Sequence, residues 1–265
     1  MSKNKCTGDR KSPFSALIGR RLLALVAVLS AVTAGPANSD MRPIQGFDID
    51  LTEVTIGSFR QFVDATGTVT LAERQNGGLV YAAGWQRQPG WTWATPFGVP
   101  AGDDEPAVHV TFDEAAAFCR WAGKRLPRAS EWRLAAYTEM RPAAPPPFRQ
   151  GRSYPYPTGD TPMGANCYQD CGATAAIDHR AVLRRGIGHA PAGRSKAGVN
   201  GLYDMAANVW EWVDTWADAD RRDRRLTLGG SWWYGAAQMH RDHSAGKPPD
   251  MAVVYIGFRC AQDWP

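Results

Sequence analysis

Short runs of apolar and polar residues follow one another along the chain, and they predict brief helices and strands. From Phe47 to Val54 apolar and polar residues alternate, which is typical of a half-buried strand. The next segment predicts a helix that Gly67 ends, because its apolar residues recur at helical spacing: Ile56, Phe59, Phe62 and Val63. Thr111 to Glu114 has the sequence of a capping box and therefore predicts a helix start. That helix ends at Gly123 and carries one apolar face: Ala115, Phe118, Cys119 and Ala122.

A further helix is predicted around Trp132, Ala135 and Ala136, but long stretches between these elements have no period. Residues 72–106 and 140–200 are interrupted by proline and glycine. So much irregular chain normally counts against an assignment of elements in a compact domain. The alternative is a fold whose long loops are held by disulfides, metals and buried tryptophan, and the 11 tryptophans favour it.

Composition and charge separate residues 1–39 from the rest. The chain has 265 residues, of which 44% are hydrophobic and 21% charged, so it is not a disordered chain, a coiled coil or a collagen-like fibre. Six of the 30 basic and one of the 26 acidic residues precede Asp40, so residues 1–39 carry +5 and the remainder carries −1. We therefore expect neither nucleic acid nor an anionic membrane as a partner of residues 40–265.

The first 39 residues have the pattern of a secretory signal peptide. A short apolar run from Leu22 to Ala34 follows the pair Arg20-Arg21 and precedes the small residues Ala37-Asn38-Ser39. We expect export to the periplasm or beyond, with cleavage after Ser39. The arginine pair leaves the twin-arginine route open beside the general one. A buried core helix and an uncleaved anchor are the alternatives.

Export makes the cysteines informative, because an oxidising compartment favours disulfides. Four of them follow the signal peptide, and three pairings are open: Cys119, Cys167, Cys171 and Cys260. The close spacing of Cys167 and Cys171 could close a small loop or contribute to a metal site. No second cysteine or histidine pair at zinc-site spacing follows, so the disulfide is the favoured interpretation.

Several motifs lie in order along residues 40–265. They are TEVT (52–55), PAVHV (106–110), AFCRWAGKRLPRASEW (117–132), NGLYDMAANVWEW (200–212), GGSW (229–232) and IGFRC (256–260). Together they resemble the formylglycine-generating enzyme, or sulfatase-modifying factor, family. The resemblance implies a single α+β domain over residues 40–265, irregular, loop-rich and C-type-lectin-like, and we expect a monomer.

The resemblance also implies covalent and metal cross-links. Cys119 and Cys260 match a structural disulfide of the family, two buried free thiols being the alternative. A second family disulfide would need cysteines near Ala135 and at Ser244, so we expect Cys167 and Cys171 to cross-link locally instead. A structural calcium ion is implied at the side chains of Asp204 and Glu211 and the carbonyls of Ala207 and Val209. The alternative is a solvated acidic face.

A second family calcium site would begin at Asn166, with Asp178 as its candidate acidic partner. The active enzymes of the family bind copper(I) through two cysteines after the GGS motif, and use it to oxidise a substrate cysteine with O₂. At those two positions this chain has Tyr234 and Met239. We therefore do not expect a copper cofactor of that kind, nor conversion of a sulfatase cysteine to formylglycine.

The segment from Trp232 to His243 still matches the pocket of the family. Our candidate catalytic residues are Ser231, Trp232, Tyr234, Met239, His240 and Arg241. Met239 with a histidine could bind copper in a rebuilt site, although packing in the core is the favoured role for Met239. Aromatic residues could stack an aromatic substrate, and Arg241 could hold an anionic group or simply pair at the surface. Glu211, Asp242 or a histidine could move protons.

Two classes of function remain open. The first is an oxidoreductase or maturation factor acting on a periplasmic protein or an aromatic small molecule, as in siderophore-maturation relatives. The second is a non-catalytic paralog that binds or modulates a client protein, or an accessory factor of a periplasmic metalloenzyme system. The basic run from Arg221 to Arg225 is interleaved with acidic residues and predicts a solvated loop. The sequence contains no P-loop, no G-x-S-x-G motif and no H-E-x-x-H motif.

Overall fold

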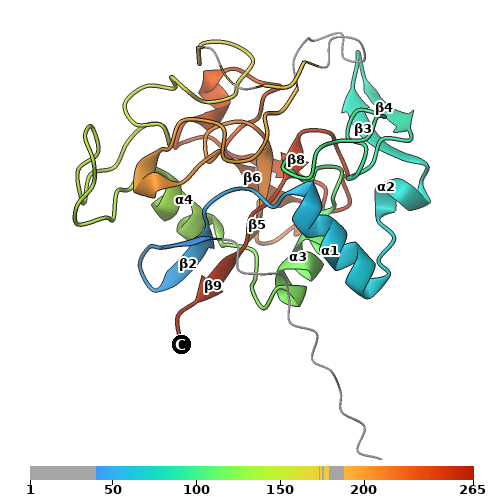
Figure 1. Cartoon of the computed structure of the whole chain (residues 1–265), viewed down its shortest axis with the longest axis horizontal. Helices are drawn as coiled ribbons and strands as arrows, with labels where there is room; N and C mark the ends of the chain where they lie inside the picture. The colour runs from blue at the N-terminus through green and yellow to red at the C-terminus, as the bar shows by residue number, and fades with distance from the viewer. Residues whose placement is uncertain (1–39, 173, 175, 179–187) are drawn as a thin grey trace, which may run out of the picture. The chain divides into compact units, whose positions relative to one another are not determined.

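A computed structural model describes residues 40–265 apart from 173, 175 and 179–187 (Figure 1). The predicted signal peptide, residues 1–39, lies outside the described residues. The described residues belong to one compact unit. Within the described part of the chain, no helix has the length and apolar character needed to cross a membrane.

The helices are short, and the three predicted from the sequence are present. The α-helices are α1 (Ile56–Thr66), α2 (Leu71–Arg74), α3 (Phe112–Trp121) and α4 (Ala129–Tyr137), and the 3-10 helices are η1 (Val199–Gly201) and η2 (Ala236–Met239). Gly67 follows α1 in the left-handed conformation, with φ of 66°. The capping box before α3 is confirmed, because Thr111 accepts from the Glu114 amide and Glu114 accepts from the Thr111 amide.

The strands form three small sheets. The first has the order β1 (Met41–Pro43), β2 (Phe47–Asp50) and β9 (Ala261–Asp263). The second is the hairpin of β3 (Gly77–Tyr81) and β4 (Trp85–Pro89). The third has the order β7 (Ala245–Lys247), β6 (Arg225–Leu228), β5 (Trp210–Trp216) and β8 (Ile256–Gly257), with β5 and β8 parallel.

Two expectations about these elements need correction. The strand predicted from Phe47 to Val54 ends at Asp50, where the backbone bends at Leu51. Residues 72–106, predicted to be irregular, contain most of α2 and the whole β3–β4 hairpin. β4 is almost entirely exposed, so it has no apolar period, and its pairing with β3 is not visible in its sequence.

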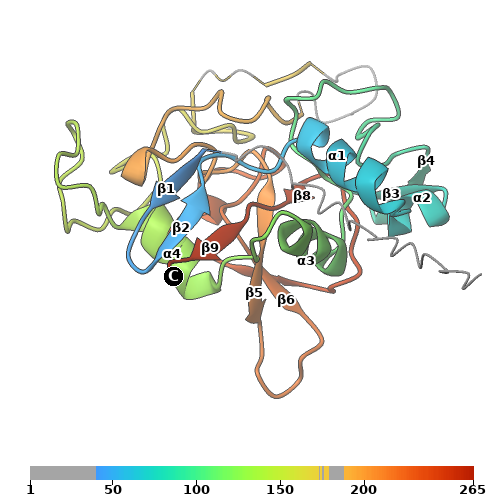
Figure 2. The ribbon, with the colours of Figure 1, turned by 60° about the horizontal axis from the view of Figure 1, so that its bottom comes forward.

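Buried aromatic side chains hold the irregular chain together, as the tryptophan content predicted. Figure 2 shows β5 between α3 and α4. A tryptophan side chain makes a hydrogen bond on each side of β5. The Trp212 indole donates to the Val110 carbonyl just before α3, at 3.0 Å. The Trp132 indole of α4 donates to Glu211 of β5 at 2.7 Å. Phe59 of α1 and Phe118 of α3 stack with their centroids 5.8 Å apart.

Both expected disulfides are present. Cys119 of α3 is bonded to Cys260, which directly precedes β9, across 141 residues of sequence. Cys167 is bonded to Cys171 within one loop. The first therefore ties α3 to the C-terminal end of the chain, while the second constrains only its own loop.

Candidate functional site

The candidate site begins at a turn that only glycine can form. Gly229 and Gly230 both have positive φ, at 95° and 78°. A Cβ atom at Gly229 would lie 3.0 Å from the Met205 carbonyl oxygen and 3.2 Å from the Trp132 ring. Because this turn passes so close to the core, it carries the next residue, Ser231, into the interior.

Three of the six candidate catalytic residues are buried. Ser231, Trp232 and Met239 are 1%, 2% and 0% exposed. The Ser231 hydroxyl accepts from the Trp233 amide, and the Trp232 ring packs against Trp233 with centroids 5.0 Å apart. Met239 belongs to a small apolar cluster that also holds Cys167 and Cys171. Packing in the core, the role favoured for Met239, is therefore the one it has.

Tyr234 is half-buried among aromatic rings. Its centroid lies 5.9 Å from that of Trp210 and 5.7 Å from that of Tyr255. Its hydroxyl is 3.5 Å from the Tyr255 hydroxyl, and its carbonyl accepts from the Tyr168 amide in the Cys167–Cys171 loop. That loop therefore packs directly against the first of the two positions at which active members of the family carry a cysteine.

His240 lies at the surface instead, in an open cavity of about 420 Å³ lined by Tyr156, Ala237, His240, Asp242 and His243. Nδ1 of His240 is 3.4 Å from the Asp242 amide nitrogen and 3.4 Å from an Asp242 carboxylate oxygen. A neutral ring can accept the amide hydrogen at Nδ1, and a protonated ring can donate to the carboxylate. Tyr156 packs edge-on to His240, at 5.5 Å between centroids.

His243 also lines this cavity. Its ring lies 5.7 Å from that of Trp210. Burial lowers the pKa of His243, and the nearby Lys247 ammonium lowers it further. A neutral imidazole is therefore favoured there at neutral pH.

Arg241 borders a neighbouring cavity of about 330 Å³, which also has Asp242 in its wall. The structure therefore divides the six predicted residues: three are buried, Tyr234 is half-buried, and His240 and Arg241 line adjoining cavities. Sequence reasoning missed Tyr156 and Arg133, which line these cavities from other elements. Of these two residues, only Arg133 could have been proposed from the sequence, because it lies on the polar face of α4.

Glu211 is fully buried in β5 and lines neither cavity. Its two oxygens accept from Nε and Nη2 of Arg259, both at 2.8 Å, and from the Trp132 indole. Because the side chain is enclosed with a permanent cation, its surroundings do not favour the proton-transfer role considered for Glu211, which stays a prediction. Asp242 and the histidines keep that role as candidates.

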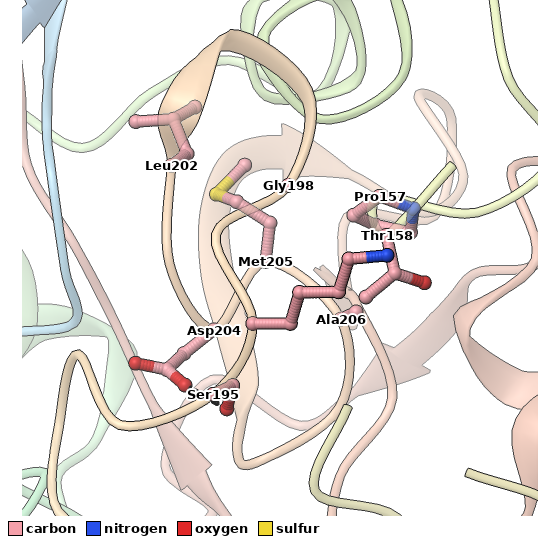
Figure 3. Close-up of a pocket in the computed structure, with 9 residues that line it drawn as sticks. Pro157, Thr158, Ser195, Gly198, Leu202, Asp204, Met205 and Ala206 are labelled. Atoms are coloured by element: carbon pink, nitrogen blue, oxygen red, sulfur yellow. Dashed lines mark hydrogen bonds between the residues drawn. The ribbon is translucent and has the colours of Figure 1, made fainter. Parts of the chain in front are cut away.

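The residues expected to hold calcium lie in a tight turn. Asp204 and Ala207 have left-handed backbone conformations, with φ of 57° and 60°. Asp204 accepts from the Gly193 amide and the Ser195 hydroxyl, beside a cavity of only about 10 Å³ (Figure 3). That volume is about the size of one water molecule.

Acidic side chains outnumber basic ones around this turn. Glu53 is buried close to Asp204 and Glu211, and Arg259 is the cation that pairs with Glu211 there. Burial, with repulsion from Asp204 and Glu211, raises the pKa of the Glu53 carboxyl well above its ordinary value. Burial also raises the pKa of Asp204. A calcium ion bound by Asp204, Glu211 and the carbonyls of Ala207 and Val209 would offset this excess of negative charge.

Asn166, the candidate ligand of the second calcium site, is also engaged in hydrogen bonds. Asn166 donates to the Asn208 side chain at 2.9 Å and accepts from the Thr174 hydroxyl at 2.8 Å. The second calcium site, at Asn166 and Asp178, stays a prediction. Across residues 40–265, outside the gaps named above, no group of three or more histidine, cysteine, aspartate or glutamate side chains is arranged to hold a metal.

Comparison with known proteins agrees with the motifs and the fold. The family model of the sulfatase-modifying factor enzyme 1-like domain matches residues 27–264. The chain belongs to this family. A formylglycine-generating enzyme from Thermomonospora curvata is 31% identical, over 82% of this chain and 82% of its own length. A mouse relative named inactive C-alpha-formylglycine-generating enzyme 2 is 30% identical, over 92% and 83%.

Solved structures show the same fold at lower sequence identity. The structure of PvdO from Pseudomonas aeruginosa superposes with a TM-score of 0.56, at 20% identity and over 82% of this chain and 80% of that one. The domain is thus α+β, formylglycine-generating-enzyme-like and C-type-lectin-like, as expected.

Proposed function

We propose that this protein is an exported maturation factor that acts on an aromatic substrate without the copper–cysteine chemistry of the family. Its export rests on the signal-peptide pattern of residues 1–39. The proposal rests on the residues that stand at the two positions where active members of the family carry a cysteine. Tyr234 is packed among aromatic rings and Met239 is fully buried, so neither offers a thiolate to a metal.

The cavity at His240 supplies the alternative chemistry. Tyr156 and His243 offer aromatic faces to a bound ring, and a volume of about 420 Å³ is within the range of small-molecule sites. The Asp242 carboxylate lies 3.4 Å from Nδ1 of His240 and can accept a hydrogen bond from it. His240 would then act as the general base or acid, and Asp242 would support it.

The test has two parts. The purified protein is incubated with copper, O₂, a reductant and a cysteine-containing sulfatase peptide, and we expect no aldehyde. Titration with p-cresol, followed by NMR, should then show saturable binding that Tyr156→Ala and His240→Ala weaken. Tyr81→Ala is the matched control, because Tyr81 is exposed on the β3–β4 hairpin and lines neither cavity. Aldehyde formation, or p-cresol binding that is equal in all variants, would contradict the proposal.

A second candidate is a non-catalytic protein that binds a client. The tip of the β3–β4 hairpin exposes Tyr81 and Trp85, at 47% and 48%, with ring centroids 5.4 Å apart. Exposed aromatic residues are enriched at protein interfaces. The inactive mouse relative matches nearly the whole chain, which also favours a non-catalytic role. This candidate predicts that Tyr81 and Trp85 variants impair the biological function while His240→Ala does not.

A further inference from the structure

The second cavity, of about 330 Å³, is lined on one side by a single face of α4. Ser130, Arg133, Leu134 and Tyr137 follow one another at helical spacing and all border it. Ser153 and Arg241 also line it, and Asp242 lines both this cavity and the aromatic cavity. The two cavities are therefore neighbours with one shared wall.

Hydrogen bonds hold the walls of this cavity in place. The Tyr137 hydroxyl donates to the Met239 carbonyl at 3.1 Å, which fastens the end of η2 to α4. The Arg241 amide donates to the Pro155 carbonyl at 3.0 Å. The hydroxyls of Thr138 and Ser153 are 2.8 Å apart. None of these three contacts uses the guanidinium group of Arg133 or Arg241.

Arg133 differs from most buried or half-buried arginines of this protein. Its Nε is buried without a hydrogen-bond partner, and among the described residues no carboxylate forms an ion pair with it. By contrast, Arg125 pairs with Glu131 and Arg259 with Glu211, both within 2.8 Å. Arg241 has only Asp242, with 3.9 Å between Nε and the nearest carboxylate oxygen.

The charges of the cavity select a class of ligand. Arg133 and Arg241 contribute two positive charges, and Asp242 contributes one negative charge, so a single negative charge on a ligand would balance them. A guanidinium matches the two oxygens of a carboxylate in a bidentate pair. The hydroxyls of Ser130 and Ser153 add donors of the kind that an oxyanion accepts.

We propose that this cavity binds the carboxylate of a substrate whose aromatic ring occupies the neighbouring cavity at Tyr156 and His240. The ring part rests on the proposed function, whereas the carboxylate part rests on Arg133 and Arg241 alone. Because Asp242 borders both cavities, a ring in one and a carboxylate in the other need only a short connection. The substrate class is then an aromatic monocarboxylate.

The experiment uses three probes with the mature chain, residues 40–265. They are p-cresol, acetate and 4-hydroxyphenylacetate, which supply the ring, the carboxylate and both together. We expect 4-hydroxyphenylacetate to bind more tightly than either of the others. Arg133→Gln should weaken its binding roughly tenfold or more, the size of a charge-assisted hydrogen bond. The same substitution should remove acetate binding and leave p-cresol binding unchanged.

Two further variants make the result specific. Arg241→Gln should weaken binding of the carboxylate probes in the same way. Because the Arg241 side chain is exposed, we expect this variant to fold, which circular dichroism checks. Arg120→Gln is the matched control, since Arg120 is exposed on α3 and lines neither cavity, and it should bind all three probes like the wild type.

The outcomes separate this proposal from the proposed function. Acetate binding that depends on Arg133, without p-cresol binding, would support the carboxylate site and contradict the aromatic site. The carboxylate site would be overturned if p-cresol binds, 4-hydroxyphenylacetate binds no more tightly than p-cresol, and Arg133→Gln changes neither affinity. That result would leave the proposed function intact. Equal binding of 4-hydroxyphenylacetate to wild type and both arginine variants would also overturn it.

Discussion

Arg259 is fully buried, and its guanidinium donates four hydrogen bonds. Two go to the Glu211 carboxylate, and the others go to the carbonyls of Asp50 and Tyr203. Such a buried pair is costly to form but far more costly to break on one side only, because an unpaired charge then remains in the interior. At this position a single guanidinium joins the C-terminal segment to β5 and to the end of β2.

The change Arg259→Met tests this role. We expect it to lower the free energy of unfolding by about 3–5 kcal/mol, because Glu211 is left buried without its cation. The measurement is urea unfolding followed by tryptophan fluorescence. Arg221→Met is the control, since Arg221 pairs with Asp223 at the surface and should cost less than about 1 kcal/mol. Similar losses in the two variants would show that the buried pair has no special weight.

His109 provides a prediction for pH dependence. Its ring is fully buried, its Nε2 is 3.0 Å from the Pro96 carbonyl, and burial lowers the pKa to about 4 from 6.5. Between these values the unfolded chain takes up a proton and the folded protein does not. The contribution of His109 to stability is therefore complete above about pH 6.5 and is lost as the pH falls toward about 4.

The variant His109→Asn isolates this contribution, because asparagine tolerates the left-handed backbone at this position, where φ is 56°. We expect the unfolding free energy of the wild type to fall by about 3 kcal/mol more than that of the variant over this range. Denaturant unfolding at a series of pH values measures both curves. Parallel curves for the two proteins would refute the assignment.

At the scale of elements, the disulfides differ in what they join. The bond from Cys119 in α3 to Cys260 beside β9 closes 141 residues of sequence, whereas the bond between Cys167 and Cys171 closes 4. Loop-closure entropy grows with the number of residues enclosed. The first bond should therefore restrict the unfolded chain much more than the second.

Replacing each pair with alanine measures the difference. We expect a loss of about 5 kcal/mol for Cys119 and Cys260 and about 2 kcal/mol for Cys167 and Cys171, from the chain-entropy relation. Thermal unfolding of the two double variants, made in the same exported form, is the measurement. The prediction fails if the short loop contributes as much as the long one.

At the scale of the whole molecule, calcium is the expected cross-link of the turn from Asp204 to Glu211. That turn contacts the N-terminal segment through Glu53, which accepts from the side chain of Asn208 and the amide of Val209 at 2.7 and 3.1 Å. An ion bound here would therefore stabilise segments that are far apart in the sequence. It would also reduce the repulsion among three buried carboxylates.

A thermal melt with calcium or with a chelator tests this expectation. We expect a higher melting temperature in calcium, corresponding to about 2.7 kcal/mol when the ion is at a hundred times its dissociation constant. The variant Glu211→Ala should lose the difference between the two conditions, although it is less stable in both. Asp223→Ala, at an exposed surface pair, should keep it. An unchanged melting temperature of the wild type would exclude a structural calcium ion.

The family, three helices with the capping box at Thr111, and the absence of cysteine at Tyr234 and Met239 could all be read from the amino-acid sequence. These features are local, because they depend on residue identity and short spacing. The β3–β4 hairpin escaped prediction because exposed strands lack an apolar period. The pairing of Glu211 with Arg259 is visible only in the folded structure, because packing sets the contacts between residues that are far apart in sequence. The folded structure alone also placed Arg133 and Arg241 around one cavity next to His240, because α4 and the segment after η2 meet only in the folded protein.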